Sequence, residues 1–222
     1  MRPNGIFGCA RPARLSRVRL WPVAYIARRH VTIAVEGSAE TANGRRWAQT
    51  MNEALVELFR HKTWATVLLI EACRGLDEDV LDATTPGTYG TIRETLHHLV
   101  CADESYLATV TGQRPADPLP SEQVSLETLA DLTRQLGPRW EALARDPEIA
   151  TREVTTRDGW RTPAAIPMAQ AIHHAECHRG HVLSVLGAHS IEIPGLDIGE
   201  DLDVWHHGIA VGLMQEVTPA PG

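Results

Sequence analysis

Histidines are the residues of this 222-residue chain whose spacing best fits a defined chemistry, that of a bound metal ion. Six of the eleven histidines fall in two groups: His97 and His98, then His173, His174, His178 and His181. His174 and His178 lie four residues apart, and His181 follows three further on, so a helix would place them on one face. Neutral imidazole is the usual nitrogen ligand of ions such as zinc or nickel. A third imidazole from a facing helix would complete three protein ligands and leave a position open to water or substrate.

The spacing alone leaves a second ligand set open. His173, Cys177 and His181 share a neighbouring helical face, and His97 with Cys101 could lie opposite them. Thiolate ligands in such a set would favour zinc or copper in a closed site. The pattern does not decide which histidine of the first group turns inward, and histidines on a solvated surface are the alternative to any metal site.

Five neighbours of these histidines carry other reactive groups. Glu176 and Arg179 are expected to point away from the histidine face and to form solvent-exposed or interhelical ion pairs. Asp103 and Glu104 are nearer candidates for supporting a ligand or acting as a general base. Cys177 is expected to be buried as a small apolar residue rather than to act as a nucleophile.

Four helices are predicted to position these side chains, because Gly and Pro delimit stretches of helical periodicity. They span residues 51–74, about 91–111, about 125–145 and about 163–186. Thr91 and Glu94 have the spacing of a capping box, and Ser125 is a suitable N-cap. Gly137-Pro138 predicts a kink or a break in the third helix, and Thr162-Pro163 is expected to cap the fourth.

The predicted fold is all-α: an antiparallel four-helix bundle with a short β-hairpin before the last helix. The hairpin follows from Asp158-Gly159, a strong turn signal between the β-branched segment around Val154 and Trp160. The chain divides into an Arg-rich extension (residues 1–50), the bundle (51–205) and a C-terminal tail (206–222). The extension has the composition of a transit peptide, of a nucleic-acid-binding arm or of a disordered segment, and we favour the last.

Charge and composition exclude several classes of protein. Residues 1–50 hold nine arginines and two acidic residues, for a charge of +7, whereas the rest of the chain carries −14. A domain this acidic repels a phosphate backbone, so nucleic acid is not expected as a partner. No apolar run approaches the about 20 residues that cross a bilayer, so no membrane partner is expected either. The four cysteines lack CxxC spacing, which favours a reducing, cytoplasmic location.

Three motifs resemble those of the DinB/YfiT-like family of four-helix-bundle metalloproteins. Residues 90–99 (GTIRETLHHL) are similar to the family's Leu-x-His segment in the second helix. Residues 174–181 (HAECHRGH) resemble the HxxxHRGQ signature, with His181 in place of the common Gln. Residues 202–205 (LDVW) are similar to the terminal Leu-Asp-aromatic segment, and the resemblance covers the chain from Met51 to about Val204.

The resemblance implies that His98, His174 and His178 are the metal ligands, with His181 as a further candidate. It also implies a homodimer acting on a small-molecule substrate. The predicted function is a thiol-dependent transferase that uses zinc or nickel and a low-molecular-weight thiol. The alternatives are a metal-dependent hydrolase and a non-catalytic metal-binding stress protein.

Overall fold

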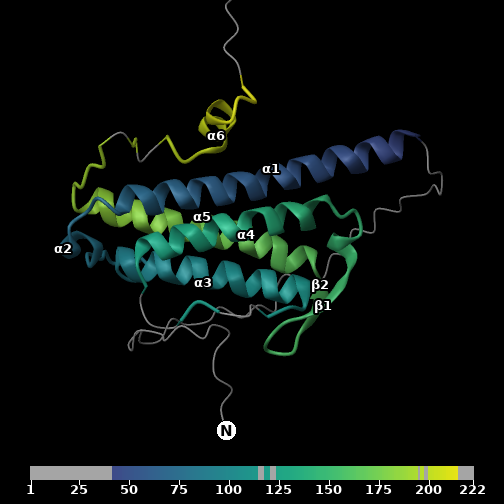
Figure 1. Cartoon of the computed structure of the whole chain (residues 1–222), viewed down its shortest axis with the longest axis horizontal. Coiled ribbons are helices and arrows are strands. Elements are labelled where there is room, and N and C mark those ends of the chain that lie inside the picture. The colour runs from purple at the N-terminus through teal and green to yellow at the C-terminus, as the bar shows by residue number, and fades with distance from the viewer. Residues whose placement is uncertain (1–41, 115–117, 121–123, 195, 198–199, 215–222) are drawn as a thin grey trace, which may run out of the picture.

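The computed structural model describes residues 42–114, 118–120, 124–194, 196–197 and 200–214 (Figure 1). Four long helices form the bundle: α1 (Ala42–Cys73), α3 (Ile92–Thr111), α4 (Leu126–Arg145) and α5 (Ala165–Ala188). The shorter elements are α2 (Glu78–Leu81), the 3-10 helix η2 (Ile149–Thr151), strands β1 (Glu153–Thr155) and β2 (Arg161–Pro163), and α6 (Val204–Ala210). The predicted all-α bundle with a hairpin before its last long helix is therefore confirmed.

Side-chain caps begin two of the long helices where the sequence predicts them. The Thr91 hydroxyl accepts from the Glu94 amide at 3.1 Å, and the Glu94 carboxylate accepts from the Thr91 amide at 3.0 Å. This capping box fixes the start of α3, and Gly112 ends it in the left-handed conformation at φ 70°. The Ser125 hydroxyl likewise accepts from the Thr128 amide at 3.1 Å and begins α4.

The start of α5 differs from the prediction. Strands β1 and β2 pair antiparallel around Gly159, whose φ of 89° suits the hairpin turn. Thr162 and Pro163 belong to β2, so they extend the hairpin instead of capping the helix. The helix begins at Ala165, with Ala164 in the N-cap position and no side-chain cap. The two residues that the local pattern assigned to the helix cap thus pair with β1 instead.

Three other boundaries also differ from those expected. The helix α1 begins at Ala42 rather than at Met51, and residues 1–41 of the predicted extension lie outside the described residues. The helix α4 is continuous through Pro138, so the predicted break does not occur. Proline removes one backbone hydrogen bond from a helix, and the packed length of α4 against α1 outweighs that loss. The helix α6 runs across the boundary predicted between residues 205 and 206.

The packing of the helices shows their relative directions. The pairs α1–α4 and α3–α5 are antiparallel, whereas α3 and α4 run in the same direction (Figure 1). One apolar cluster joins the start of α3 to the start of α4 and to the ends of α1 and α5. The other joins the opposite ends of the same helices. Between the end of α3 and the start of α4, Leu119 donates its amide to Glu104 of α3 at 3.1 Å.

A buried polar layer lies in the bundle between helices α1, α3 and α4. Lys62 donates to Asp103 at 2.5 Å, and the Trp140 indole donates to the same carboxylate at 3.0 Å. The Lys62 ammonium also lies 5.3 Å from the Trp140 ring centre and 5.8 Å from that of Phe59. Both oxygens of Asp103 are thus committed to the core, which matters for the site described below.

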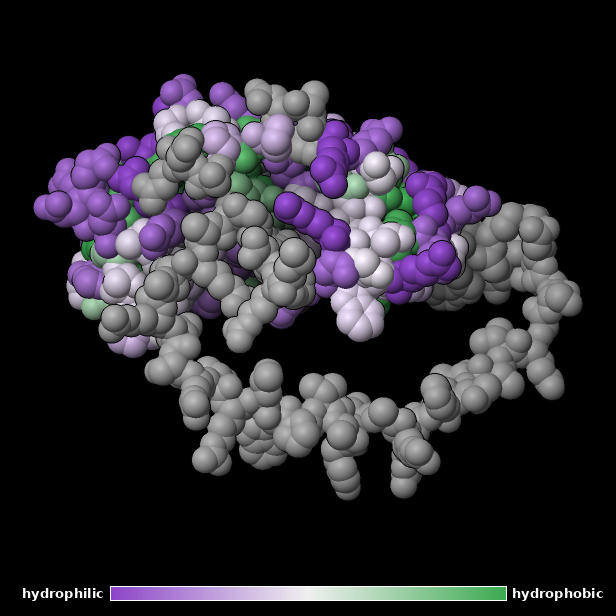
Figure 2. All heavy atoms as spheres, turned by 90° about the horizontal axis from the view of Figure 1, so that it is seen from below, coloured by the Kyte–Doolittle hydropathy of each residue, from purple (hydrophilic) through white to green (hydrophobic). Residues whose placement is uncertain are grey.

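One face of the described residues is largely hydrophilic (Figure 2). The face shown in Figure 2 is dominated by hydrophilic side chains, with hydrophobic residues scattered among them. Among the described residues, no helix combines the length and the apolar character needed to cross a membrane.

Candidate metal centre

Three histidines from two helices converge at the seam between α3 and α5. His98 of α3 and His174 and His178 of α5 each offer a ring nitrogen, and these atoms all lie within 4.8 Å of one another. The Nε2 atoms of His98 and His174 are 3.1 Å apart. The ring centres are 4.8 Å apart for His98 and His178, and 4.2 Å for His174 and His178. This group, here called the histidine triad, has the donor set and the compactness of a three-ligand metal site.

Local geometry and packing each supply part of the triad. The four-residue spacing puts His174 and His178 one turn apart on the same face of α5. The capping box sets where α3 begins, and the antiparallel packing of α3 on α5 brings His98 to that face. The ring of His98, rather than that of His97, meets the two imidazoles of α5.

The environment keeps the triad imidazoles uncharged. Burial, reinforced by the neighbouring imidazoles, lowers the pKa of His98 to about 4, of His174 to about 3 and of His178 to about 4. All three rings are therefore neutral at pH 7, and each has a nitrogen lone pair to donate. The buried Nδ1 atom of His178 has no hydrogen-bond partner among the described residues. A divalent cation fits this donor set, because it binds neutral imidazole nitrogens and compensates their burial.

Two tyrosines flank the triad on different sides. The ring of Tyr89, from the loop before α3, stacks on His98 with centres 4.1 Å apart and planes at 15°. It also meets the ring of His178 edge-on at 5.1 Å. Tyr106 of α3 meets His174 edge-on at 5.6 Å. The sequence places neither tyrosine at the site, because Tyr89 lies outside the predicted helices and Tyr106 fits an apolar position of the helix over about 91–111.

His181 lies next to the triad without being part of its compact group. Its ring centre is 5.1 Å from that of His178, with the planes at 90°. The group of nitrogens within 4.8 Å of one another comprises His98, His174 and His178 alone among the described residues. His181 as a further ligand therefore stays a prediction.

The alternative ligand set is not assembled. His97 lies 3.0 Å from the Pro120 carbonyl oxygen, and its nearest sulfur, that of Cys101, is 3.8 Å away. Cys177 contacts His173 at 3.5 Å on the exposed side of α5. The expected burial of Cys177 is thus wrong, because α3 packs against the triad face of α5 and leaves this neighbouring face to solvent.

The charged neighbours also have different roles from those considered. Asp103 is bound to Lys62 and Trp140, so it supports the core rather than the triad. Glu104 accepts from the Leu119 amide. Arg179 is buried against α1, where it donates to the Thr66 hydroxyl at 3.1 Å, and it pairs with Glu176 on its own helix. Arg179 therefore bonds between helices through hydrogen bonds to α1, while its ion pair with Glu176 lies within α5 and is not the expected interhelical pair.

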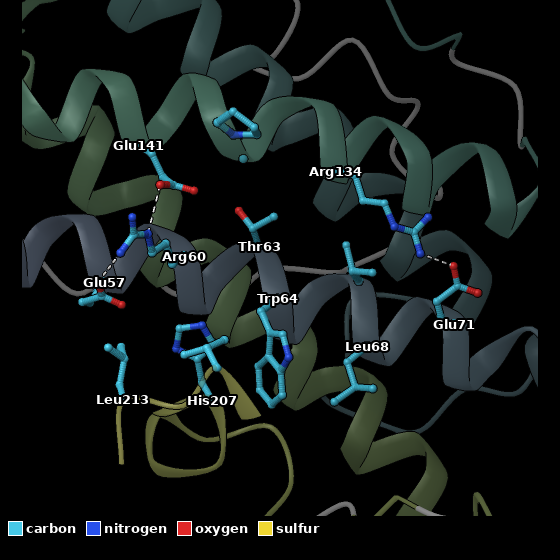
Figure 3. Close-up of a pocket in the computed structure, with 14 residues that line it drawn as sticks. Glu57, Arg60, Thr63, Trp64, Leu68, Glu71, Arg134, Glu141, His207 and Leu213 are labelled. Atoms are coloured by element: carbon cyan, nitrogen blue, oxygen red, sulfur yellow. Dashed lines mark hydrogen bonds and ion pairs between the residues drawn. The ribbon is translucent and has the colours of Figure 1, made fainter. Parts of the chain in front are cut away.

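A separate groove of about 580 Å³ lies on α1, α4 and α6 (Figure 3). Its lining includes Trp64 and Leu68 of α1, His207 of α6 and Leu213, and no residue of α3 or α5. Ion pairs cross from α1 to α4 along its edge, with Arg60 2.9 Å from Glu141. The groove is therefore distinct from the histidine triad.

Comparisons with known proteins place the fold and the motifs in context. The family model described as "DinB family" matches residues 51–202. A crystal structure of a DinB-like protein from Bacillus cereus ATCC 10987 is similar to this chain, with a TM-score of 0.50 and 22% sequence identity. The similarity covers 65% of this chain and 97% of that one, and at this identity it shows the fold alone. No curated protein matches the sequence. Since the family model covers more than half of the chain and ends with the last residue of the bundle core, Leu202, the chain belongs to the DinB family.

Proposed function

We propose that this protein is a metal-dependent transferase that uses a low-molecular-weight thiol, with zinc or nickel held by His98, His174 and His178. The observation that carries the proposal is the triad itself: three neutral imidazoles within 4.8 Å, supplied by two rigid helices. Such an ion supplies Lewis-acid chemistry, because it lowers the pKa of a thiol or water that it binds. Three protein ligands leave room for that exogenous group.

In the proposed reaction, the thiol sulfur forms a bond to an electrophilic carbon of a small-molecule substrate. The leaving group departs from that carbon with the electron pair, and the thiol proton passes to solvent. The protein contributes orientation: Tyr89 packs on the rings of His98 and His178, and Tyr106 on that of His174. Rigid ligands hold the reacting groups in place and so lower the entropic cost of bringing them together.

The first experiment measures metal content by elemental analysis of untagged protein purified without chelator. Wild type is expected to hold about one zinc or nickel per chain, and His98→Ala, His174→Ala and His178→Ala to lose it, because two imidazoles bind such an ion far more weakly than three do. The variants His97→Ala and His173→Ala are matched controls, since each removes a histidine adjacent in sequence but outside the triad. Metal that survives in a triad variant and is lost in a control would contradict the assignment.

The second experiment tests the thiol with cobalt-loaded protein, because a thiolate ligand adds a charge-transfer band to the Co²⁺ spectrum. The band is expected on titration with 2-mercaptoethanol and should be missing from His174→Ala treated in the same way. A metal-bound protein with no thiol response would instead favour the hydrolase or the non-catalytic metal-binding protein.

Assembly and location are part of the same proposal. We infer a homodimer from the family resemblance and a cytoplasmic location from the cysteine spacing. Exposed apolar side chains on and after α6, among them Trp205 and Ile209, support contact with another surface. Light scattering coupled to size-exclusion chromatography measures the mass and would contradict the dimer if it gave that of a monomer.

A further inference from the structure

Tyr106 and Gln170 meet across the α3–α5 seam one helical turn from the triad. Gln170 donates to the Tyr106 hydroxyl at 3.5 Å, and the Tyr106 ring meets that of His174 edge-on. Gln170 precedes His174 by four residues in α5, so the two lie about 6 Å apart along the helix axis and on the same face. The face of α5 that carries His174 and His178 therefore also carries Gln170.

The triad is more accessible on this side than on the other. Gln170 is exposed, and both Tyr106 and His174 are half-buried. On the other side, the Tyr89 ring covers His98 and His178, which are both buried. A molecule that reaches the triad from solvent would thus pass along Tyr106 and Gln170.

The two side chains have complementary hydrogen-bonding groups. The Tyr106 phenol offers a hydroxyl that can donate a hydrogen bond. The Gln170 amide both donates and accepts. Their mutual contact of 3.5 Å is at the long end of the range for a hydrogen bond, so a well-placed ligand group can replace it. A phenol donor beside a primary amide is suited to a secondary amide, which offers one carbonyl oxygen and one N–H.

We propose that Tyr106 and Gln170 form a subsite that binds the amide group of a thiol whose sulfur lies at the histidine triad. The inference rests on the proposed function and narrows its thiol to those with an amide a few bonds from the sulfur. In N-acetylcysteamine the amide follows the sulfur after two carbons, a separation that matches the single turn between His174 and Gln170. Tyr106 and Gln170 are positioning residues in this scheme.

The test compares two neutral primary thiols on cobalt-loaded full-length protein. N-acetylcysteamine carries the amide and 2-mercaptoethanol lacks it, and both are followed by the charge-transfer band. Wild type is expected to bind N-acetylcysteamine about five-fold more tightly, the contribution of one hydrogen bond. In Tyr106→Phe and Gln170→Leu the ratio of the two affinities should fall towards one, through a loss of affinity for N-acetylcysteamine. Tyr89→Phe is the matched control, because it removes a phenol hydroxyl from the other side and should keep the preference.

Three results would overturn the subsite. One is an unchanged preference in both variants. Another is an equal loss of affinity for both thiols, which would show that the residues support the metal centre rather than the amide. The third is the lack of a 2-mercaptoethanol band in wild type, which refutes the thiol chemistry of the proposed function before any variant is compared. The failure of the subsite alone is thus distinguishable from the failure of the function.

Discussion

At the scale of residues, the triad depends on rings that hold one another in place. His98 is fixed between the stacked face of Tyr89 and the imidazoles of α5. An imidazole that is held in its ligating orientation before the ion arrives loses less rotational freedom on binding. The ring of Tyr89, through its stacked contact with His98, provides this constraint.

The substitution Tyr89→Ala should therefore speed the loss of metal to a chelator. Aromatic pairs contribute about 0.5–1.5 kcal/mol, so a release rate about three to ten times that of wild type is expected. Tyr89→Phe keeps the stacked ring and should release metal at the wild-type rate. Stopped-flow absorbance with a chromogenic chelator measures both, and equal rates for Tyr89→Ala and wild type would contradict the role of the ring.

At the scale of elements, two contacts hold α1 in the bundle and so position the helices that carry the triad. The first is the buried ion pair of Lys62, the single lysine of the chain, with Asp103 of α3. Burial lowers the pKa of Lys62, and the carboxylate of Asp103 opposes that shift. The second is the close approach of α1 and α4, where a β-carbon at Gly137 would lie 2.7 Å from the Thr63 methyl group.

Replacing Asp103 by Leu should destabilise the fold by about 3–5 kcal/mol, because it leaves a buried ammonium without its partner. The indole N–H of Trp140 loses its acceptor in the same variant. Urea unfolding of the metal-free protein measures the loss, and the double variant Lys62→Met/Asp103→Leu should recover part of it. Asp131→Leu breaks an exposed ion pair with Arg134 and is expected to cost less than about 1 kcal/mol. Similar losses in the buried and exposed variants would contradict the prediction.

Gly137→Ala should also destabilise the protein, by about 1–3 kcal/mol, although alanine is the better helix former. The added methyl group meets Thr63 and forces α1 and α4 apart. Gly180→Ala is the matched control, since a β-carbon there meets nothing within 4 Å and should be neutral or stabilising by up to about 1 kcal/mol. The same urea titration tests both, and a stabilised Gly137→Ala variant would show that the helices separate at little cost.

At the scale of the whole molecule, buried neutral histidines couple stability to pH. The triad lies between α3 and α5, while His61 of α1 contacts the Leu202 carbonyl oxygen at 2.8 Å and His207 of α6 packs near it. Burial lowers the pKa of all five below the ordinary value of 6.5. The unfolded chain therefore binds more protons than the folded protein does between about pH 6.5 and pH 4. Stability rises with pH wherever this holds, so the free energy of unfolding falls as the pH is lowered through that range.

The metal-free protein is accordingly expected to unfold at lower temperature and lower urea concentration at pH 5 than at pH 7. His174→Ala should have a shallower dependence, because it removes the triad imidazole whose pKa is lowest, about 3. Thermal unfolding followed by circular dichroism at several pH values gives the comparison. An unfolding temperature independent of pH between 5 and 7 would refute neutral, buried histidines in the triad.

Local interactions are the part of this structure that the sequence by itself determined. Thr91 with Glu94, Ser125 and the Asp158-Gly159 turn act within three or four residues of themselves, and each sets the boundary that its pattern predicts. The one-turn spacing of His174 and His178 is equally local. These features need no knowledge of the packing partner, because short-range hydrogen bonds and helix geometry fix them.

The tertiary structure decided everything that depends on which elements meet. His98 rather than His97 faces α5, Asp103 forms an ion pair with Lys62, and Cys177 is exposed to solvent. The tertiary structure also brought Tyr89 against His98 and Gln170 against Tyr106. Gln170 continues the four-residue spacing of His174 and His178, so the sequence pattern could have pointed to it. The parallel course of α3 and α4 is likewise a matter of which helix ends share an apolar cluster. Burial of the apolar clusters at both ends of the bundle selects among these arrangements. The hydrophobic effect is non-directional and depends on the total apolar area that distant segments bury together. No local sequence pattern therefore encodes the outcome.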